Sequence, residues 1–215
     1  MMPKKLIIFL KVLVHLACLL PIAWLVYAGF ENNLGPDPTH TVTFFTGRST
    51  LRLLAITLAI SPVRKLIPKL GWLIRFRRLV GLYAFFYACL HLLTYVWLYA
   101  GFSLAAMEQD ISQRRFIVAG LAAWLLMVPL ALTSTNWSIR KLGGKNWNRL
   151  HKLTYAAAIA GLVHYWWGVK PGVTTPMFLT LLIGGLLLAR PVVKAIREGK
   201  NGDRKPPVAV GAEKM

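Results

Sequence analysis

Long apolar runs separated by short polar stretches dominate the chain. Six runs are long enough to predict membrane-spanning helices, because about 20 apolar residues cross a hydrocarbon core. We expect these spans at about 6–30, 48–67, 79–101, 114–134, 150–169 and 176–190. No alternation of apolar and polar residues, which is typical of strands, lies between them. The pattern predicts an all-α integral membrane protein, a bundle of six transmembrane helices.

The first two runs are the hardest to delimit. The first could be a signal peptide, but it is about twice as long as the apolar part of such peptides, so we interpret it as a retained helix. Gly35, Pro36 and Pro38 predict a loop before the second run. That second run is irregular, because Arg52 lies one turn inside it and Pro62 would kink it.

The remaining polar stretches predict loops and a tail. Loops are expected at 102–113, 135–148 and 168–176. Residues 194–215 are charged and contain Gly and Pro, which predicts a disordered cytoplasmic tail. Residues 1–193 therefore form one transmembrane domain, and no repeat of fixed period is visible along it.

Composition and charge support a membrane protein. The chain is 56% hydrophobic and carries a formal net charge of +19, a pairing that is unusual for a soluble domain. The basic residues lie in brief clusters beside the apolar runs rather than along one stripe, so we expect membrane lipid and no nucleic acid as a partner. Cys18 and Cys89 lie within apolar runs and are not expected to pair.

The basic clusters predict an orientation. With six spans, 20 of the 26 Lys and Arg fall on one side, in the two termini and in the segments 64–78 and 140–152. Basic loops stay in the cytoplasm, so both termini of this multi-pass protein are predicted to be cytoplasmic. The other side keeps Arg48, Arg114, Arg115 and Lys170.

Two histidines lie at matching depth in different spans. His91 is twelve residues into the third span and His164 fourteen residues into the fifth, and both spans run outward. Ionisable residues within a bilayer are costly and usually functional. Two neutral imidazoles facing each other across a bundle can hold a haem iron from both sides, so His91 and His164 are the predicted axial ligands.

Other interpretations of these histidines remain. A single membrane histidine can simply bond a neighbouring helix, and a His-lined metal-ion transporter or a haem-free anchor or assembly subunit are rival functions. A transporter is disfavoured because no H-x-x-x-H motif, Met cluster or nearby carboxylate supplies a cation path. His151 lies at the cytoplasmic rim and His15 within the first span, and both are candidates for a second site.

Basic and aromatic side chains suggest where cofactors could be held. Arg48 and Arg52, one turn apart near the outer surface, could pair with haem propionates. On the cytoplasmic side an anionic cofactor could dock against Lys145, Trp147, Arg149, Arg77 and Arg78. No G-x-G-x-x-G motif is present, so the chain is not expected to bind a dinucleotide through a Rossmann domain and must obtain its electrons from another source.

Two blocks resemble one known family. FRRLVGLYAFFYACLHLLTYVWL and NWNRLHKLTYAAAIAGLVHYWWGVKP, which contain His91, His151 and His164, are similar to the haem-binding membrane subunits of the protein-methionine-sulfoxide reductase system, the MsrQ or YedZ family. That family belongs to the ferric-reductase-like transmembrane superfamily, which also includes the membrane part of NADPH oxidases. The resemblance extends over essentially all six spans.

The resemblance implies a role in electron transfer. It implies a bacterial inner-membrane protein that carries haem b and also FMN. Such a subunit passes electrons from the quinone pool or a cytosolic flavin reductase to a periplasmic molybdopterin enzyme, MsrP, which reduces oxidised methionine. Catalysis is then expected on the partner rather than on this chain.

One departure from the oxidases concerns the inner half of the membrane. The oxidases carry two histidines on the third helix, whereas this chain has Arg77 and Arg78 at the inner position. We therefore expect a non-haem redox group, FMN or a quinone, near His151, Arg77, Arg78 and Trp147. The alternative is a second haem ligated by His151 and possibly by His15.

Overall fold

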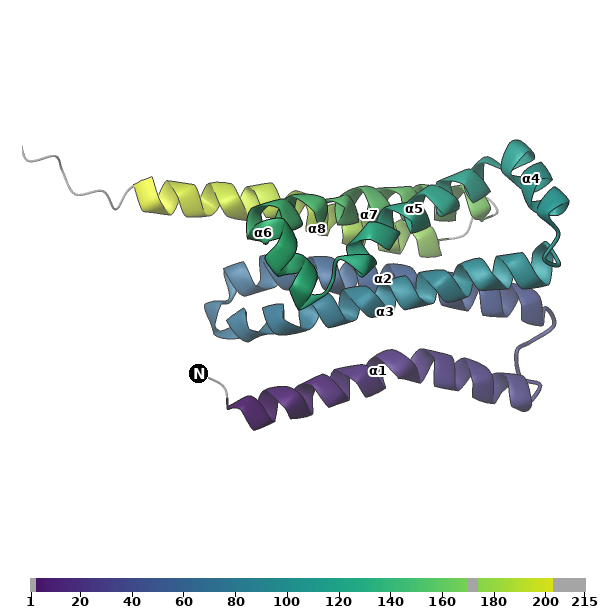
Figure 1. Cartoon of the computed structure of the whole chain (residues 1–215), viewed down its shortest axis with the longest axis horizontal. Coiled ribbons are helices and arrows are strands. Elements are labelled where there is room, and N and C mark those ends of the chain that lie inside the picture. Colours follow the sequence, from purple (N-terminus) through teal and green to yellow (C-terminus); the bar gives the residue numbers. More distant parts are fainter. Residues whose placement is uncertain (1–2, 170–173, 203–215) are drawn as a thin grey trace, which may run out of the picture.

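The computed structural model describes residues 3–169 and 174–202 of the chain. Within these residues the regular structure is entirely helical, as the sequence predicts (Figure 1). Six long helices make up the body of the molecule. They are α1 (Lys4–Phe30), α2 (Pro38–Leu66), α3 (Ile74–Thr94), α5 (Arg115–Leu132), α7 (Leu153–Gly168) and α8 (Thr175–Gly202).

Shorter helical elements lie at the two ends of the bundle. The helix α4 (Leu104–Gln113) is at one end and α6 (Asn136–Leu150) at the other (Figure 1). A 3-10 helix, η1 (Pro68–Leu73), connects α2 to α3, and a π-helix, η2 (Tyr95–Tyr99), continues α3. The α3 helix and its continuation thus run together from Ile74 to Tyr99.

Parts of three stretches predicted without helix are helical. The predicted loops 102–113 and 135–148 contain α4 and α6, and the predicted tail is helical from 194 to 202. Ser103 and Thr135 cap the first two helices, because their hydroxyl oxygens accept from the N–H groups of Ala106 at 3.3 Å and Ser138 at 3.0 Å. Residues 170–173 of the third predicted loop and 203–215 of the predicted tail lie outside the described residues.

The second long helix begins earlier than predicted. It starts at Pro38, ahead of the predicted start at residue 48. Asp37 caps it by accepting from the His40 N–H at 2.9 Å, and proline is tolerated in the first turn, where its missing N–H would have no helical partner. Pro62 lies inside α2, is buried, and does not end the helix.

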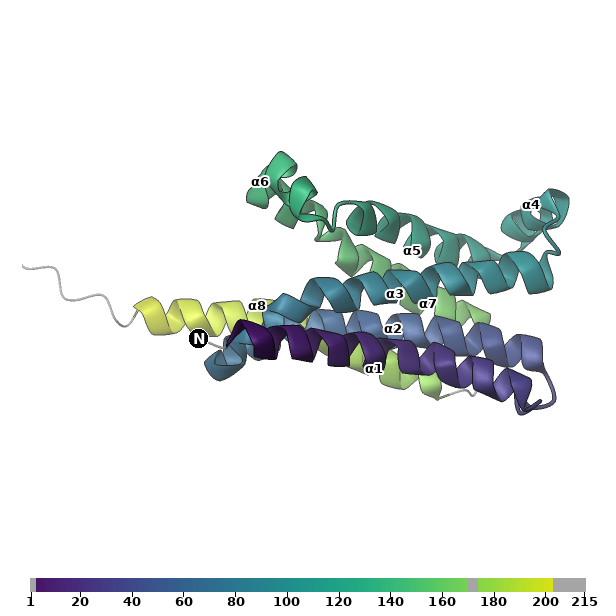
Figure 2. The same cartoon turned by 60° about the horizontal axis from the view of Figure 1, so that its bottom comes forward.

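The core lies where two helix pairs meet. The α3 helix packs along α2, α5 packs along α7, and α8 contacts both α2 and α7 (Figures 1 and 2). Small residues at the crossings let the backbones approach closely. Several core side chains from α2, α3, α7 and α8 are at most 4% exposed, among them Leu54, Leu58, Ala84, Ala158 and Ile183.

The α1 helix lies on the other side of α3 from α5 and α6 (Figure 2). Only Cys18, Leu25 and Ala28 are buried among its residues. The fully buried Tyr87 of α3 holds it, donating its hydroxyl to the Cys18 carbonyl at 2.8 Å and accepting from the Ile22 N–H at 3.1 Å. In a regular helix the Cys18 carbonyl would accept from the Ile22 N–H. The Tyr87 hydroxyl lies between these two groups and so replaces one backbone hydrogen bond of α1 beside Pro21.

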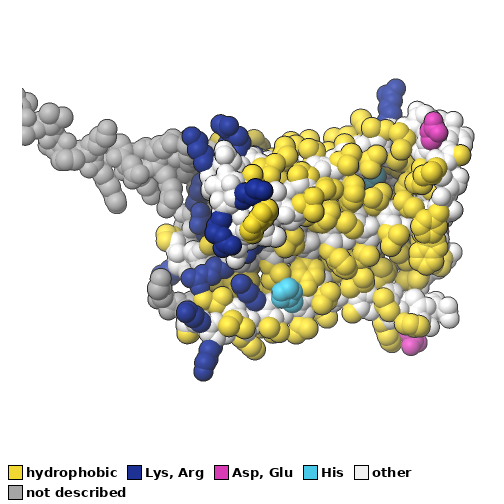
Figure 3. Space-filling model, in the orientation of Figure 1, with side chains coloured by type: hydrophobic (Ala, Val, Ile, Leu, Met, Phe, Trp, Pro, Cys, Tyr) yellow, Lys and Arg dark blue, Asp and Glu magenta, His cyan; other side chains and the backbone are white. Residues whose placement is uncertain are grey.

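Apolar length and charge identify a membrane protein. Among the described residues, Lys4–Phe30, Pro68–Tyr99 and Arg115–Leu132 are long and apolar enough to cross a bilayer, and Pro176–Ala189 is a shorter apolar helix. In Figure 3, Lys and Arg side chains gather at the end that holds α6 and the N-terminus, carboxylates lie at the opposite end, and apolar side chains cover the surface between them. The molecule therefore presents an apolar belt with one basic rim.

Candidate functional site

The structure brings His91 of α3 and His164 of α7 together. Their ring centroids are 5.7 Å apart and the ring planes are nearly perpendicular, at 75°. The two residues are far apart in sequence, and they meet because α2–α3 and α5–α7 pack side by side. A metal–imidazole bond of about 2 Å on each side of one ion would place the two centroids about 6 Å apart. The observed separation fits two axial ligands of one metal.

Backbone carbonyls fix the chemical form of both rings. His91 donates from Nδ1 to the Thr43 carbonyl of α2 at 2.9 Å, and His164 donates from Nδ1 to the Phe116 carbonyl of α5 at 2.6 Å. A carbonyl oxygen can only accept, so Nδ1 carries the hydrogen in each ring. In a neutral ring the Nε2 lone pair is then free to bind a metal, which is the usual arrangement of ligating histidines.

Two glycines make room for these rings. A Cβ built on Gly120 of α5 would lie 2.6 Å from His164 Nδ1, closer than real contacts allow. A Cβ on Gly47 of α2 would lie 3.0 Å from His91 Cε1. The imidazoles therefore lie directly against the backbone of the neighbouring helices. Sequence analysis missed both glycines and both carbonyls, and the only available signal was the equal distance in sequence between each glycine and its histidine.

The surroundings of the pair favour a metal that brings its own further ligands. Within the described residues no group of three or more His, Cys, Asp and Glu is placed to hold an ion. Two imidazoles alone would leave an ion short of ligands, whereas a porphyrin supplies four nitrogens and needs only axial ones. Aromatic rings lie nearby, since Phe116 is 5.9 Å from His164 and Phe44 is 6.5 Å from Tyr165. The donor set and its apolar walls fit haem.

A second candidate site lies at the basic end. His151, between α6 and α7, stacks on Trp147 at 3.7 Å and donates from Nδ1 to the Trp147 carbonyl at 3.0 Å. Its Nε2 is buried and has no hydrogen-bond partner of good geometry among the described residues. Burial lowers the pKa of His151 and the positive charge of Arg77 lowers it further, while the backbone carbonyls of Trp147 and Leu130 oppose both effects. In the neutral ring, with its hydrogen on Nδ1, the Nε2 lone pair has no hydrogen-bond donor among the described residues.

Some of the predicted residues around His151 are brought together and others are not. Arg77 acts electrostatically on His151, and Arg78 donates to the Asn136 side chain of α6 at 2.7 Å. Lys145 and Arg149 are exposed on α6. Arg77, Arg78, Trp147 and His151 thus share one corner between α3 and α6.

The other predicted residues lie elsewhere. His15 of α1 is exposed and its Nδ1 is 2.8 Å from the hydroxyl of Tyr83 on α3. It therefore contacts α3 from α1, which lies on the other side of α3 from α6 (Figure 2). Arg48 donates from Nε to the Phe44 carbonyl at 3.3 Å, and Arg52 is exposed on α2.

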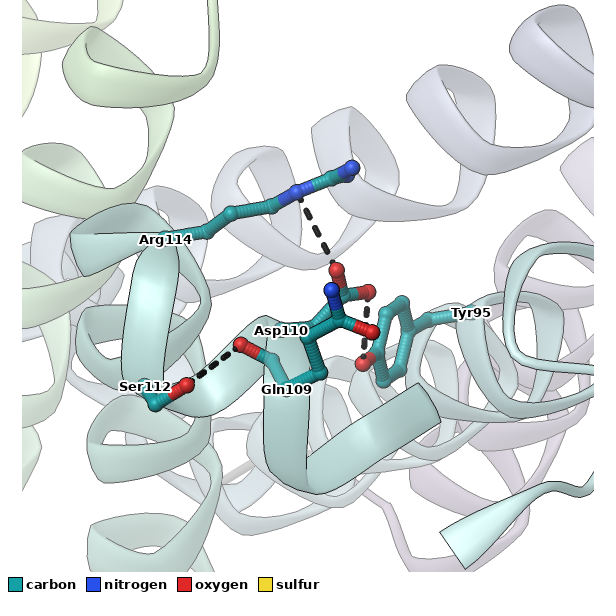
Figure 4. Close-up of polar contacts among 5 residues, drawn as sticks. All are labelled: Tyr95, Gln109, Asp110, Ser112 and Arg114. Atoms are coloured by element: carbon teal, nitrogen blue, oxygen red, sulfur yellow. Dashed lines mark hydrogen bonds and ion pairs between the residues drawn. The ribbon is translucent and has the colours of Figure 1, made fainter. Parts of the chain in front are cut away.

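The sequence analysis also missed a polar cluster at the acidic end, formed by Tyr95, Asp110 and Arg114, which we call the latch. The Asp110 carboxylate of α4 accepts from the Tyr95 hydroxyl at 3.1 Å and pairs with Arg114 Nε at 3.1 Å (Figure 4). Ser112 donates to the Gln109 carbonyl at 2.7 Å within the same helix. The latch ties α4 to the π-helix that continues α3, at the end of the molecule opposite the basic rim.

Comparison with known proteins identifies the family. Residues 46–162 match the family described as ferric reductase like transmembrane component. The chain is 42% identical to a relative from Herminiimonas arsenicoxydans, over 84% of each chain. It is 44% identical to one from Azospira oryzae, over 94% of this chain and 86% of the relative. Both relatives are named protein-methionine-sulfoxide reductase heme-binding subunit MsrQ.

The match also covers most of the candidate site. A third relative of the same name, from Polaromonas naphthalenivorans, is 46% identical over 73% of this chain and 71% of its own. No solved structure matches the chain. The region matched to the transmembrane family contains Gly47, His91, Gly120 and His151 and ends just before His164. Residues 46–162 match this transmembrane family, and the relatives are more than 40% identical to the chain over most of its length. The chain therefore belongs to the MsrQ family of ferric-reductase-like transmembrane proteins.

Proposed function

We propose that this chain is a membrane electron-transfer subunit that binds haem b between His91 and His164. The observation that carries the proposal is the pair of facing imidazoles whose Nδ1 hydrogens are committed to the Thr43 and Phe116 carbonyls. That arrangement leaves both Nε2 lone pairs for one metal. Bound haem would supply reversible one-electron chemistry at its iron. The chain itself holds the two ligands at a fixed separation and surrounds them with apolar side chains.

The acceptor of the electrons would be a catalytic partner. The relatives are named as subunits of a protein-methionine-sulfoxide reductase, and we propose a periplasmic molybdopterin enzyme, MsrP, as the partner of this chain. Reduction of one sulfoxide to a thioether consumes two electrons and two protons and releases water. A one-electron carrier must therefore deliver two electrons in succession for each oxidised methionine.

Six membrane crossings with both termini in the cytoplasm are part of the proposal. The basic rim supports this orientation, because Lys and Arg remain on the cytoplasmic side of the bacterial inner membrane. Cysteines at Lys145 on α6 and at Gln113 on α4, in a chain lacking Cys18 and Cys89, would test it. In intact cells an impermeant thiol reagent should label position 113 and spare position 145. The reverse labelling would overturn the orientation.

Electrons need a route from the basic end to the haem. His151 and His164 are thirteen residues apart, which corresponds to about 20 Å along a helix. We propose that FMN or a quinone binds at the corner of His151, Trp147, Arg77 and Arg78, with the quinone pool or a cytosolic flavin reductase as donor. The open acceptor on His151 supports it, since that Nε2 can receive a hydrogen bond from such a group. A second haem on His151 is the alternative.

An optical spectrum of the purified protein tests the haem proposal. The protein should show a low-spin haem spectrum that is absent from the His91→Ala/His164→Ala double variant. His40→Ala is a matched control, because His40 is exposed at the start of α2 and stacks on Phe44 at 4.0 Å. A colourless protein after haem-sufficient expression would favour a haem-free anchor or a metal-ion transporter, and ion flux into vesicles would separate those two.

The His151→Ala variant tests the inner site. It should keep the resting haem spectrum while its haem is reduced more slowly by the quinol or flavin donor. Haem and flavin are then measured per chain on the same sample. Two haems per chain, one of them lost with His151, and no flavin would favour the diheme alternative.

A further inference from the structure

The two histidines are held by the same backbone device on two different helices. In α2 the Thr43 carbonyl accepts from His91, and Gly47 lies one turn further along. In α5 the Phe116 carbonyl accepts from His164, and Gly120 lies one turn further along. Each histidine follows its carbonyl by 48 residues. Because residues four apart share a helix face, the carbonyl and the glycine contact the same ring.

Among the described glycines these two have the shortest contacts, and Gly161 follows, where a Cβ would lie 3.2 Å from Leu51 Cδ2. A Cβ on Gly120 would meet His164 Nδ1 at 2.6 Å, Cε1 at 2.9 Å and Cγ at 3.2 Å. A Cβ on Gly47 would meet His91 Cε1 at 3.0 Å and Nδ1 at 3.1 Å. By contrast, a Cβ on Gly81 would lie an ordinary 3.5 Å from Thr57 Cγ2, and Gly184 has nothing within 4 Å. At Gly47 and Gly120, the space that a Cβ atom would need is therefore occupied by an imidazole ring.

The carbonyl and the glycine act on different properties of the ring. The hydrogen bond to the carbonyl fixes which nitrogen carries the hydrogen and the rotation of the ring about its Cβ. The missing Cβ fixes how close the ring lies to the neighbouring helix, and so how far its Nε2 reaches towards the opposite imidazole. Together they determine the separation of the two Nε2 atoms, which a single metal requires to be about 4 Å.

We propose that Gly47 and Gly120 are positioning residues for the two ligands. Each lets its imidazole lie against the turn whose carbonyl orients it, so that both Nε2 atoms point at one centre. The proposal rests on the proposed haem ligation for its purpose, but the contact between each glycine and its ring does not depend on haem. Enlarging Gly120 should have the greater effect, because the contact of its Cβ is the shorter of the two.

The haem-loaded protein gives the first test. Gly120→Ala should lower the low-spin haem bound per chain by about tenfold, the scale of overpacking a close contact, and shift the remainder to a high-spin spectrum. Gly47→Ala should do the same to a smaller extent. Gly81→Ala is the matched control, because it also lies inside a spanning helix at the contact of α2 and α3, and it should keep the normal spectrum.

A double-mutant cycle on the haem-free protein gives the second test. Gly120→Ala should lower the melting temperature when His164 is present and should not lower it in a His164→Ala background, because the atoms it would meet are gone. An equal loss in both backgrounds, or a chain that fails to accumulate in both, would overturn the proposal. A colourless wild-type protein with the expected cycle would instead leave the positioning role standing and refute haem binding.

Discussion

The two helix pairs that hold the histidines share a geometry but differ in chemistry. In α2, the residue before Gly47 is Thr46, whose hydroxyl is 2.9 Å from both the Val42 and the Thr43 carbonyl oxygens and 3.5 Å from His91 Nδ1. In α5, the residue before Gly120 is Ala119, which has no hydroxyl. The carbonyl that orients His91 therefore has a second donor within hydrogen-bond distance, and the bond to His164 is the shorter of the two histidine bonds, 2.6 Å against 2.9 Å.

The pairs also differ in what else they bind. The α2–α3 pair buries polar side chains, including Thr46, Ser49 and Thr57, and carries α1 through Tyr87. The α5–α7 pair buries the polar side chain of Thr154 in α7, while the buried residues of α5 are the apolar Met127 and Leu130. A stronger hydrogen bond at Nδ1 makes an imidazole a better electron donor to a metal. The same arrangement, a carbonyl and a glycine one turn apart on a neighbouring helix, can thus hold two histidines that differ in how strongly they donate electrons to a metal.

Removing either ligand should have the largest effect. His91→Ala and His164→Ala should each abolish the six-coordinate low-spin spectrum, because one imidazole cannot complete the axial pair. If the second pair holds the stronger ligand, five-coordinate haem should be retained better by His91→Ala than by His164→Ala. Haem per chain and the optical spectrum of each purified variant measure this. Equal retention would remove the difference in ligand strength, and an unchanged spectrum in both variants would refute the ligation.

Releasing α1 should have an intermediate effect on the first pair alone. Tyr87→Phe removes the hydroxyl between the Cys18 carbonyl and the Ile22 N–H, which can then bond each other directly. We expect a loss of about 1 kcal/mol of stability, within the range for one net hydrogen bond. The thermal midpoint in detergent should fall by a few degrees while the haem spectrum stays normal. Phe86→Leu on the exposed side of α3 is the control, and an altered haem spectrum in Tyr87→Phe would contradict the separation of roles.

Making the two carbonyls alike should have the smallest effect. Thr46→Ala frees the Thr43 carbonyl for His91, strengthens that hydrogen bond, and should lower the haem reduction potential by less than about 60 mV, the span of a tenfold change for one electron. Ala119→Thr should raise the potential by a similar amount. Both are measured by redox titration of the haem absorbance. Shifts of the same sign in the two variants would show that the hydroxyl acts in another way.

The depth of the histidines could be predicted from the sequence, but their partners could not. Apolar run lengths place His91 and His164 at similar depth because the helix rise converts sequence into distance. The groups that orient the two rings are the carbonyls of Thr43 and Phe116, and every residue has a carbonyl, so composition gives no sign of them. The only sign of this arrangement in the sequence is that Gly47 precedes His91 by the same number of residues as Gly120 precedes His164.

The helix boundaries show a similar division. Pro38 begins α2 although it was expected in a loop, because Asp37 supplies the cap that makes a first-turn proline favourable. The polar α6 was expected to be a loop because of Gly143 and Gly144. Gly143 does interrupt it, with φ 73° and ψ 148°, yet helix continues on both sides. The glycine thus correctly indicated a break in the helix, but the prediction of a loop over the whole segment was wrong.

The crossed orientation of the two imidazole planes has a magnetic consequence. The planes are 75° apart, so the lobes of π density on the two rings would meet different d orbitals of an iron held between them. Neither orbital would then be raised much above the other, and a ferric ion bound there would keep most of its orbital angular momentum. Electron paramagnetic resonance of the oxidised protein should therefore show a strongly anisotropic low-spin signal dominated by one large g value, rather than the compact rhombic signal of parallel rings.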